Sequence, residues 1–156
     1  MAAAGTRSTG TDLLVRVWRE LAAGNEDKAR ETLVMVWKGY MDAVASEQGG
    51  RVALRLFDRL KPCTDAPDAW SRLPPRIVVY RAGPPGPSWS TDRDTVEHLL
   101  KLGFTPMRVG TVARDDVLGY IEGRGEFEII VPFERVTERQ VVARKEHPPP
   151  TASGQP

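Results

Sequence analysis

Two glutamates near the C-terminus, Glu126 and Glu128, are separated by one residue and followed by an apolar run that ends at Pro132. In a β-strand, successive side chains point to opposite faces, so we expect both carboxylates on one face and Phe127 on the other. The two acids would then lie roughly 7 Å apart, close enough to divide acid, base and electrostatic roles. Such a pair suits chemistry at a sugar carbon, where a carboxylate stabilises a developing oxocarbenium ion. The same alternation also fits a strand with one solvated face.

A second group of polar residues lies upstream. Residues 77–81 are typical of a short buried strand that ends in Arg81, and a Gly/Pro loop over residues 82–87 leads into Ser88, Trp89 and Ser90. The chain therefore offers an arginine, then Ser-x-Ser, then Glu-x-Glu before apolar residues. That order resembles the mono-ADP-ribosyltransferases of the Arg–Ser–Glu (cholera-toxin-like) clade, in the compact form of their phage and bacterial relatives. The resemblance covers about residues 76–134 and does not reach the first 70 residues.

The resemblance implies an active site that consumes NAD. Glu128 would face the positive charge that forms on the ribose when its bond to nicotinamide breaks. Glu126 would align and deprotonate the acceptor, which tends to be arginine in family members with Glu-x-Glu. Arg81 would pair with a phosphate of NAD through charge-assisted hydrogen bonds. Ser88 would hold Glu128 in place, with Ser90 on the same face.

Further positions follow from the same resemblance. Ala82 stands at a cofactor-binding position where the family usually has glycine, which restricts how closely the backbone approaches the dinucleotide. Tyr120, Arg124 and Gly125 fall on the approach to the glutamates, where the family has its substrate-recognition turn. Each assignment has a structural alternative. Arg81 could make a salt bridge, the serines could be polar residues of an edge strand, and Arg124 with Gly125 could form an ordinary hairpin turn.

The expected function is NAD-dependent transfer of ADP-ribose to a side chain of a protein acceptor, with NAD as a substrate and arginine as the expected acceptor residue. Two alternatives stay open: a non-catalytic binding module that keeps the fold, and an NAD glycohydrolase that uses water as acceptor. The sequence indicates neither which protein is the acceptor nor the oligomeric state.

Composition and residue counts argue against several other classes of function, among them nucleic-acid binding, metal binding and insertion into a membrane. A chain of 156 residues suits one domain, and a net charge of +1 gives no global field for nucleic acid. The single cysteine, Cys63, excludes an intramolecular disulfide and is expected to be a small, partly buried residue. The two histidines lack partners at ligand spacing, so no metal site is predicted. Without an apolar leader segment or a run of about 18 apolar residues, we expect a cytoplasmic protein that does not enter a membrane.

We expect an α+β fold, in which N-terminal helices precede a bent mixed β core of the ADP-ribosyltransferase type. The helical segment covers residues 1–62, a Pro-rich connector without regular structure covers residues 63–75, the core covers residues 76–146, and residues 147–156 form a disordered tail.

Periodicity and capping signals divide these segments further. Thr11 is expected to cap a helix with Trp18 on its buried face. A second helix is expected over residues 26–48, ended by Gly49 and Gly50, and a third over residues 53–60. Thr91 is expected to cap a later helix that ends at Gly103. The predicted strands after it are residues 107–113, 117–121, 126–131 and 136–143.

Overall fold

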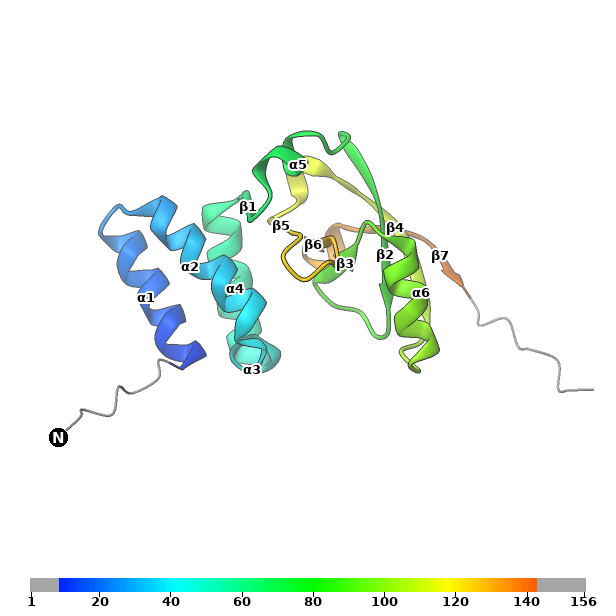
Figure 1. Cartoon of the computed structure of the whole chain (residues 1–156), viewed down its shortest axis with the longest axis horizontal. Coiled ribbons are helices and arrows are strands. Elements are labelled where there is room, and N and C mark those ends of the chain that lie inside the picture. Colours follow the sequence, from blue (N-terminus) through cyan, green and yellow to red (C-terminus); the bar gives the residue numbers. More distant parts are fainter. Residues whose placement is uncertain (1–8, 143–156) are drawn as a thin grey trace, which may run out of the picture.

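The computed structural model describes residues 9–142, which form a set of helices followed by a seven-stranded mixed sheet. Figure 1 shows the first four helices on one side of the molecule and the larger part of the sheet, with one further helix, on the other. The mixed α+β class and the order of helices before strands are therefore as predicted. The predicted tail over residues 147–156 lies outside the described residues.

The first helix, α1 (Gly10–Ala22), begins two residues earlier than predicted. Thr9 rather than Thr11 is its cap, because the Thr9 hydroxyl accepts from the Asp12 amide at 3.2 Å while the Asp12 carboxylate accepts from the Thr9 amide at 2.9 Å. Trp18, expected on the buried face, is 50% exposed. Leu13, which is 5% exposed, lies on the buried face of the helix instead.

The predicted single helix over residues 26–48 is wrong, because the chain breaks there into α2 (Glu26–Gly39) and α3 (Met41–Ala45). The predicted helix over residues 53–60 is confirmed as part of α4 (Glu47–Leu60), which begins six residues earlier. Tyr40 leaves helical geometry, and the Ser46 hydroxyl caps α4 by accepting from the Gly49 amide at 3.0 Å. Gly49 therefore does not stop a helix. It lies in the first turn of α4, where a Cβ would collide with the carbonyl of Ala43.

The Pro-rich connector also contains regular structure, contrary to expectation. It holds a short strand, β1 (Cys63–Thr64), and a one-turn helix, α5 (Pro67–Ser71). Pro67 occupies the first turn of α5, where a missing amide hydrogen leaves no bond unmade. Trp70 packs against the core of the sheet and so anchors the connector.

The sheet continues with six further strands: β2 (Arg76–Ala82), β3 (Ser88–Ser90), β4 (Met107–Ala113), β5 (Gly119–Ile121), β6 (Glu128–Ile130) and β7 (Thr137–Val142). Their spatial order is β1-β5-β6-β3-β2-β4-β7, with only β1 and β5 parallel among the described pairs. This order places β6, β3 and β2 side by side, although the first is separated from the others by about forty residues of sequence. The polar residues of these three strands are thereby brought together.

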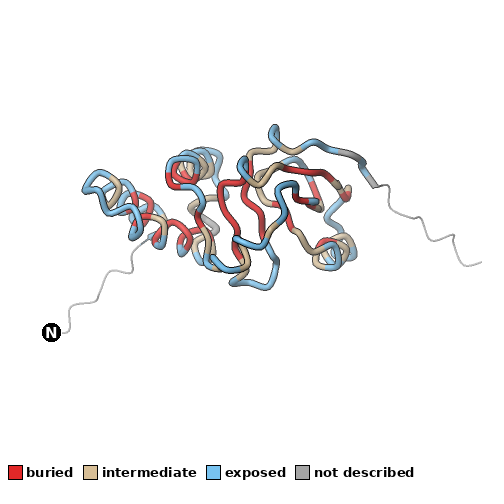
Figure 2. The backbone as a smooth tube through the Cα atoms, turned by 90° about the horizontal axis from the view of Figure 1, so that it is seen from above, coloured by how far each residue is buried: buried red, intermediate tan, exposed pale blue. Residues whose placement is uncertain are grey.

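Two apolar clusters surround the central strands. Ile121 and Ile130 pack with the helices around Phe57, whereas Tyr120 and Ile129 face a second cluster around Trp89. Neighbouring residues of β5 and β6 thus enter different cores, as expected for side chains that alternate along a strand. Seen from above, buried segments run through the strands at the centre and along the inner faces of the helices (Figure 2).

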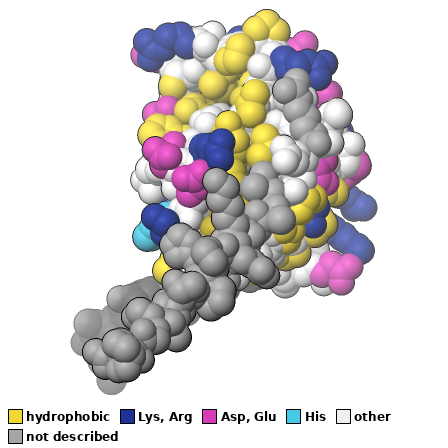
Figure 3. All heavy atoms as spheres, turned by 90° about the vertical axis from the view of Figure 1, so that its right-hand side faces the viewer, with side chains coloured by type: hydrophobic (Ala, Val, Ile, Leu, Met, Phe, Trp, Pro, Cys, Tyr) yellow, Lys and Arg dark blue, Asp and Glu magenta, His cyan; other side chains and the backbone are white. Residues whose placement is uncertain are grey.

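A sixth helix, α6 (Arg93–Lys101), packs on β2 and β3. Asp92 rather than Thr91 caps it, because its carboxylate accepts from both the amide and the hydroxyl of Thr95, at 3.3 and 2.6 Å. On the β7 side of the molecule, hydrophobic side chains form a band bordered by charged ones (Figure 3). Within residues 9–142, no helix combines the length and apolar character needed to cross a membrane.

Candidate active site

Three adjacent strands each contribute one residue to a polar cluster. In the register of the sheet, Ser90 of β3 lies opposite Glu128 of β6 and also opposite Tyr80 of β2. Two residues before Ser90, the hydroxyl of Ser88 donates to Glu128 Oε1 at 2.6 Å. Arg81, next to Tyr80 on β2, donates from Nη1 to the carbonyl of Ser88. The structure therefore brings Arg81, Ser88 and Glu128 together.

Glu128 is a buried carboxylate, 4% exposed, at the centre of this cluster. Its Oε1 accepts hydrogen bonds from Ser88 and from Trp37 Nε1, the latter at 2.9 Å. Its Oε2 lies 3.3 Å from Arg124 Nη2. Burial of an unpartnered carboxylate would cost several kcal/mol, so these three donors are what keep it in this position. They also fix the direction in which the carboxylate points.

Glu126 does not share the strand with Glu128, so the predicted Glu-x-Glu strand is wrong in this detail. Strand β6 begins only at Glu128, and Phe127 before it has a φ of +48° and an exposed ring. A positive φ at a residue other than glycine costs about 1–3 kcal/mol and is often found at functional sites. The chain therefore turns at Phe127, and the half-exposed carboxylate of Glu126 keeps one ion-pair contact, 3.8 Å from Arg124 Nη2.

Arg81 supports the loop between β2 and β3. Its Nε donates to the Pro84 carbonyl at 2.6 Å, and its Nη1 donates to the Ser88 carbonyl. Burial and then the nearby charge of Arg108 lower the pKa of Arg81, while the charge of Glu128 opposes that shift. Among the described residues, Arg81 makes no ion pair within 4.0 Å, so the predicted alternative of a structural salt bridge is not what the structure contains.

Two other predicted cofactor-binding residues, Ala82 and Ser90, make hydrogen bonds with backbone groups of the protein. Ala82 is the last residue of β2, paired with Met107, and Gly83 after it takes the positive φ of +101°. The backbone freedom expected at position 82 is therefore present one residue later. The hydroxyl of Ser90 donates to the carbonyl of Glu126 at 2.6 Å and accepts from the amide of Asp92 at 3.0 Å. Ser90 thus holds the loop before β6 and does not contact the carboxylate of Glu128.

The predicted recognition turn is only partly accessible. Tyr120 is 4% exposed, and its hydroxyl donates to Glu122 at 2.7 Å, so its ring belongs to the core and not to the approach to the site. Burial, and then the carboxylate of Glu122, raise the pKa of Tyr120. Gly125 has a φ of +70° and closes the turn through its amide, which donates to the carbonyl of Glu122 at 2.7 Å. Arg124, on this turn, points to both glutamates.

Two contacts from α2 were not predicted from the sequence. Trp37 packs edge-on against Phe57, at 5.3 Å between ring centroids, and it also donates to Glu128. The available signal was general, since a buried indole N–H needs an acceptor. Its neighbour Lys38 pairs with Asp65 at 3.0 Å.

Asp65 fixes the base of the turn that carries Arg124. Its two carboxylate oxygens accept from the amides of Glu122 and Gly123 at 2.8 and 2.9 Å. Burial acts to raise the pKa of Asp65, but the hydrogen bonds from Glu122, Lys38 and Gly123 and the charge of Lys38 together lower it. The backbone of the turn is thus attached to α2 through Asp65 and Lys38.

Two cavities adjoin the cluster. A small one of about 70 Å³ is lined by residues that include Arg81, Ser88, Glu126 and Glu128. A larger groove of about 1190 Å³ runs along α2 and reaches Arg124. Small-molecule sites usually measure about 300–1,000 Å³, so the small cavity alone does not hold a dinucleotide.

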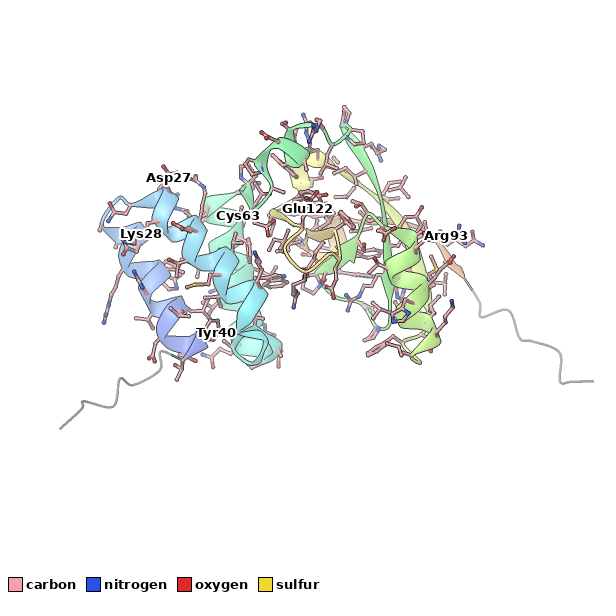
Figure 4. The ribbon with its side chains drawn as sticks, in the orientation of Figure 1. Asp27, Lys28, Tyr40, Cys63, Arg93 and Glu122 are labelled. Atoms are coloured by element: carbon pink, nitrogen blue, oxygen red, sulfur yellow. The ribbon has the colours of Figure 1, made fainter. Side chains whose placement is uncertain are left out.

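Figure 4 labels residues on and near the elements that line the groove. Asp27 and Lys28 lie at the start of α2 and Tyr40 at its end, while Glu122 lies between the helices and the sheet. The first three of these residues line the groove, and Gly123 and Arg124, which follow Glu122 on the turn, also line it.

The cluster offers acid–base and electrostatic chemistry. Among the described residues, no group of three or more His, Cys, Asp or Glu side chains is arranged to hold a metal ion. Cys63 is buried, and burial raises the pKa of its thiol to about 12, so it stays protonated near neutral pH and is a poor nucleophile. A carboxylate that is held by three donors can instead stabilise a positive charge formed next to it. No protein-family model, curated protein or solved structure matches this chain.

Proposed function

We propose that the chain transfers ADP-ribose from NAD to an arginine of another protein. The observation that carries the proposal is the meeting of Arg81, Ser88 and Glu128 from three adjacent strands, with Ser88 Oγ 2.6 Å from Glu128 Oε1. The sequence resemblance assigns these three residues to one site independently of any distance between them. Their adjacency on β2, β3 and β6 supports an ADP-ribosyltransferase-type core.

Glu128 is the electrostatic centre of the proposed reaction. The bond between the ribose C1′ and the nicotinamide nitrogen breaks, nicotinamide leaves with the electron pair, and the ribose becomes positively charged. A fixed carboxylate next to that charge lowers the barrier because it needs no reorganisation at the moment of reaction. Ser88 and Trp37 are positioning residues in this scheme, since both donate to Glu128 Oε1.

Glu126 serves the acceptor. A new bond forms between C1′ and a guanidinium nitrogen of the acceptor arginine, which must lose one proton. A guanidinium does not lose a proton readily in water, so a carboxylate beside it is a physical requirement. Glu126 is half-exposed and lies next to the same cation as Glu128, which suits a group that receives a proton and passes it to solvent.

Arg81 is assigned to the dinucleotide. Its Nε and Nη1 each donate to a backbone carbonyl, which leaves N–H groups on the guanidinium for a phosphate. The loop of residues 83–87 that it supports borders the small cavity through Ala82 and Ser88 at its two ends. Arg81 would thus act both on the loop and on NAD.

The decisive experiment is incubation of pure protein and a cell lysate with NAD labelled in its adenine half. Label on protein, together with free nicotinamide, is the expected result, and Glu128→Gln should remove both. Nicotinamide release without labelled protein would instead assign the chain to NAD hydrolysis. Neither signal in any lysate would assign it to the class of non-catalytic binding modules with this fold.

A further inference from the structure

We propose that Glu126 and Glu128 form a guanidinium subsite which Arg124 fills in the resting protein and which the acceptor arginine takes over. The inference rests on the proposed function, because it says where the acceptor binds and what must leave first. It concerns a contact within the chain that the transferase scheme alone does not require.

The guanidinium of Arg124 already lies between the two carboxylates. Its Nη2 is 3.3 Å from Glu128 Oε2 and 3.8 Å from Glu126 Oε2. A cation that is to react near Glu128 and give its proton to Glu126 must approach these same two oxygens. Arg124 therefore has the chemistry and the position of an acceptor, and an incoming arginine cannot bind there while it remains.

The side chain of Arg124 can leave without disturbing the turn. The backbone of the turn is held by the Asp65 carboxylate at Glu122 and Gly123, and it is closed by Gly125. None of these bonds involves the Arg124 side chain. Its contact with the half-exposed Glu126 is weak, and its 3.3 Å contact with the buried Glu128 is the one that an incoming guanidinium would replace.

The two cavities give this exchange a further consequence. Arg124 lines the groove of about 1190 Å³ along α2, whereas the glutamates that it contacts line the cavity of about 70 Å³. Departure of the side chain would join the groove to the space beside Glu128. An acceptor loop that lies in the groove could then present its arginine to the glutamates from the side that Arg124 now occupies.

The test is the binding of methylguanidinium, measured by calorimetric titration without NAD. Arg124→Ala empties the subsite, and a ligand that competes with a resident group binds more weakly in proportion to the fraction of open sites. Since open states of this kind are commonly populated at about 0.1–10%, Arg124→Ala should bind the probe at least about tenfold more tightly than the unmodified chain. Adding Glu128→Gln to Arg124→Ala should abolish the gain.

Arg135→Ala is the matched control. Arg135 pairs with Asp58 at 3.6 Å, with side-chain exposures of 35% and 51% that resemble those of the Arg124–Glu126 pair. It should leave methylguanidinium binding unchanged. Arg124→Gln is a second variant in case Arg124→Ala unfolds, because its amide can still donate to Glu128 while the cation is gone; melting curves check that each variant folds.

The outcomes separate the subsite from the proposed function. Equal affinity for methylguanidinium in the unmodified chain and in a folded Arg124 variant would overturn the subsite, as would a gain that survives Glu128→Gln. A gain in binding by a protein that never cleaves NAD would support the subsite and contradict the transferase function. A gain in binding together with faster ADP-ribosylation of methylguanidinium by Arg124→Ala would support both.

Discussion

Trp37 and Glu128 are 91 residues apart in the chain, yet the indole Nε1 of Trp37 donates to Glu128 Oε1 at 2.9 Å. The contact joins α2 directly to the proposed catalytic carboxylate. One residue later, Lys38 pairs with Asp65, which holds the turn that carries Arg124. The helical part of the chain is thus connected to the site at two adjacent residues of α2, and it shapes the site as well as covering the sheet.

Replacement of Trp37 by phenylalanine tests this connection. The ring would still pack on Phe57, but the donor to Glu128 would be lost. A hydrogen bond to a charged group is worth about 1.5–3 kcal/mol, so we expect nicotinamide release to slow by about tenfold or more, with KM for NAD nearly unchanged. Steady-state kinetics and denaturant unfolding measure the two effects.

Trp89→Phe is the control for that variant, because Trp89 is equally buried and its indole donates to the neutral carbonyl of Gly86 at 3.1 Å. It should lower stability without the same loss in turnover. Equal kinetic losses in the two variants would show that Trp37 acts through packing alone.

Arg81→Lys separates the loop from the dinucleotide. Lysine keeps the positive charge but cannot donate to the carbonyls of Pro84 and Ser88 together as the guanidinium does. We expect a loss of about 1–3 kcal/mol in the free energy of unfolding and weaker NAD binding. Calorimetric titration and a melt would measure both; unchanged NAD affinity in a destabilised variant would limit Arg81 to a structural role.

Asp65 provides a prediction about pH. Its pKa in the folded protein lies below the ordinary value of 3.8, so its contribution to stability is present above that value and is lost as the pH falls through the lower, folded pKa. Asp65→Asn should therefore unfold more easily than the unmodified chain at pH 7, and the difference should shrink below about pH 4. Denaturant unfolding at several pH values measures it. A difference that stays constant down to pH 2 would contradict a charged role for Asp65.

Local patterns were sufficient for several strands of the sheet. Strand β4 (Met107–Ala113) has the predicted bounds, because its apolar and β-branched residues lie between clear turn signals. The grouping of Arg81, Ser88 and Glu128 was expected from the resemblance, and it depends on the neighbouring positions of β6, β3 and β2, which no local pattern specifies. The turn of the backbone at Phe127 could not be predicted, because the alternation of apolar and polar residues contains no information on a positive φ.

Apolar periodicity also failed to predict where the helices begin and end. Apolar residues recur at helical spacing through residues 26–48, so periodicity outweighed the local signal of Gly39, which ends α2 directly before the break at Tyr40. Gly49 suggested an end, but it lies in the first turn of α4, where its amide donates to the Ser46 hydroxyl and a Cβ would collide with the carbonyl of Ala43. Contacts between distant segments, such as that of Trp37 with Glu128, depend on this tertiary arrangement and could not be read from spacing.

A pair of glycine substitutions tests that arrangement of helices. Gly49→Ala would drive a methyl group into the carbonyl of Ala43 and should lower the free energy of unfolding by about 1–3 kcal/mol. Gly39→Ala, at the end of α2 where an added methyl group would have no neighbour within 4 Å, should raise it by about 0.5–1 kcal/mol. Denaturant unfolding measures both, and a stabilising Gly49→Ala would contradict the close contact of α3 with α4.

The two glutamates should have separable roles. Glu128→Gln removes the charge that faces the ribose, so both ADP-ribose transfer and nicotinamide release should fall below detection. Glu126→Gln should remove transfer to arginine but leave NAD hydrolysis measurable, because bond cleavage needs only the charge and orientation that Glu128 supplies. Labelled NAD, with protein-bound label and free nicotinamide counted in parallel, distinguishes the two variants.

Stability completes the comparison of the two glutamates. Glu128 is buried and accepts from Trp37 and Ser88, so its replacement should cost about 1–3 kcal/mol, whereas replacement of the half-exposed Glu126 should cost less than about 1 kcal/mol. Rates are therefore compared at a temperature where melting curves show both variants to be folded. Under that condition, an equal loss of hydrolysis in the two variants would mean that the glutamates act as one unit, and the division of roles would be wrong.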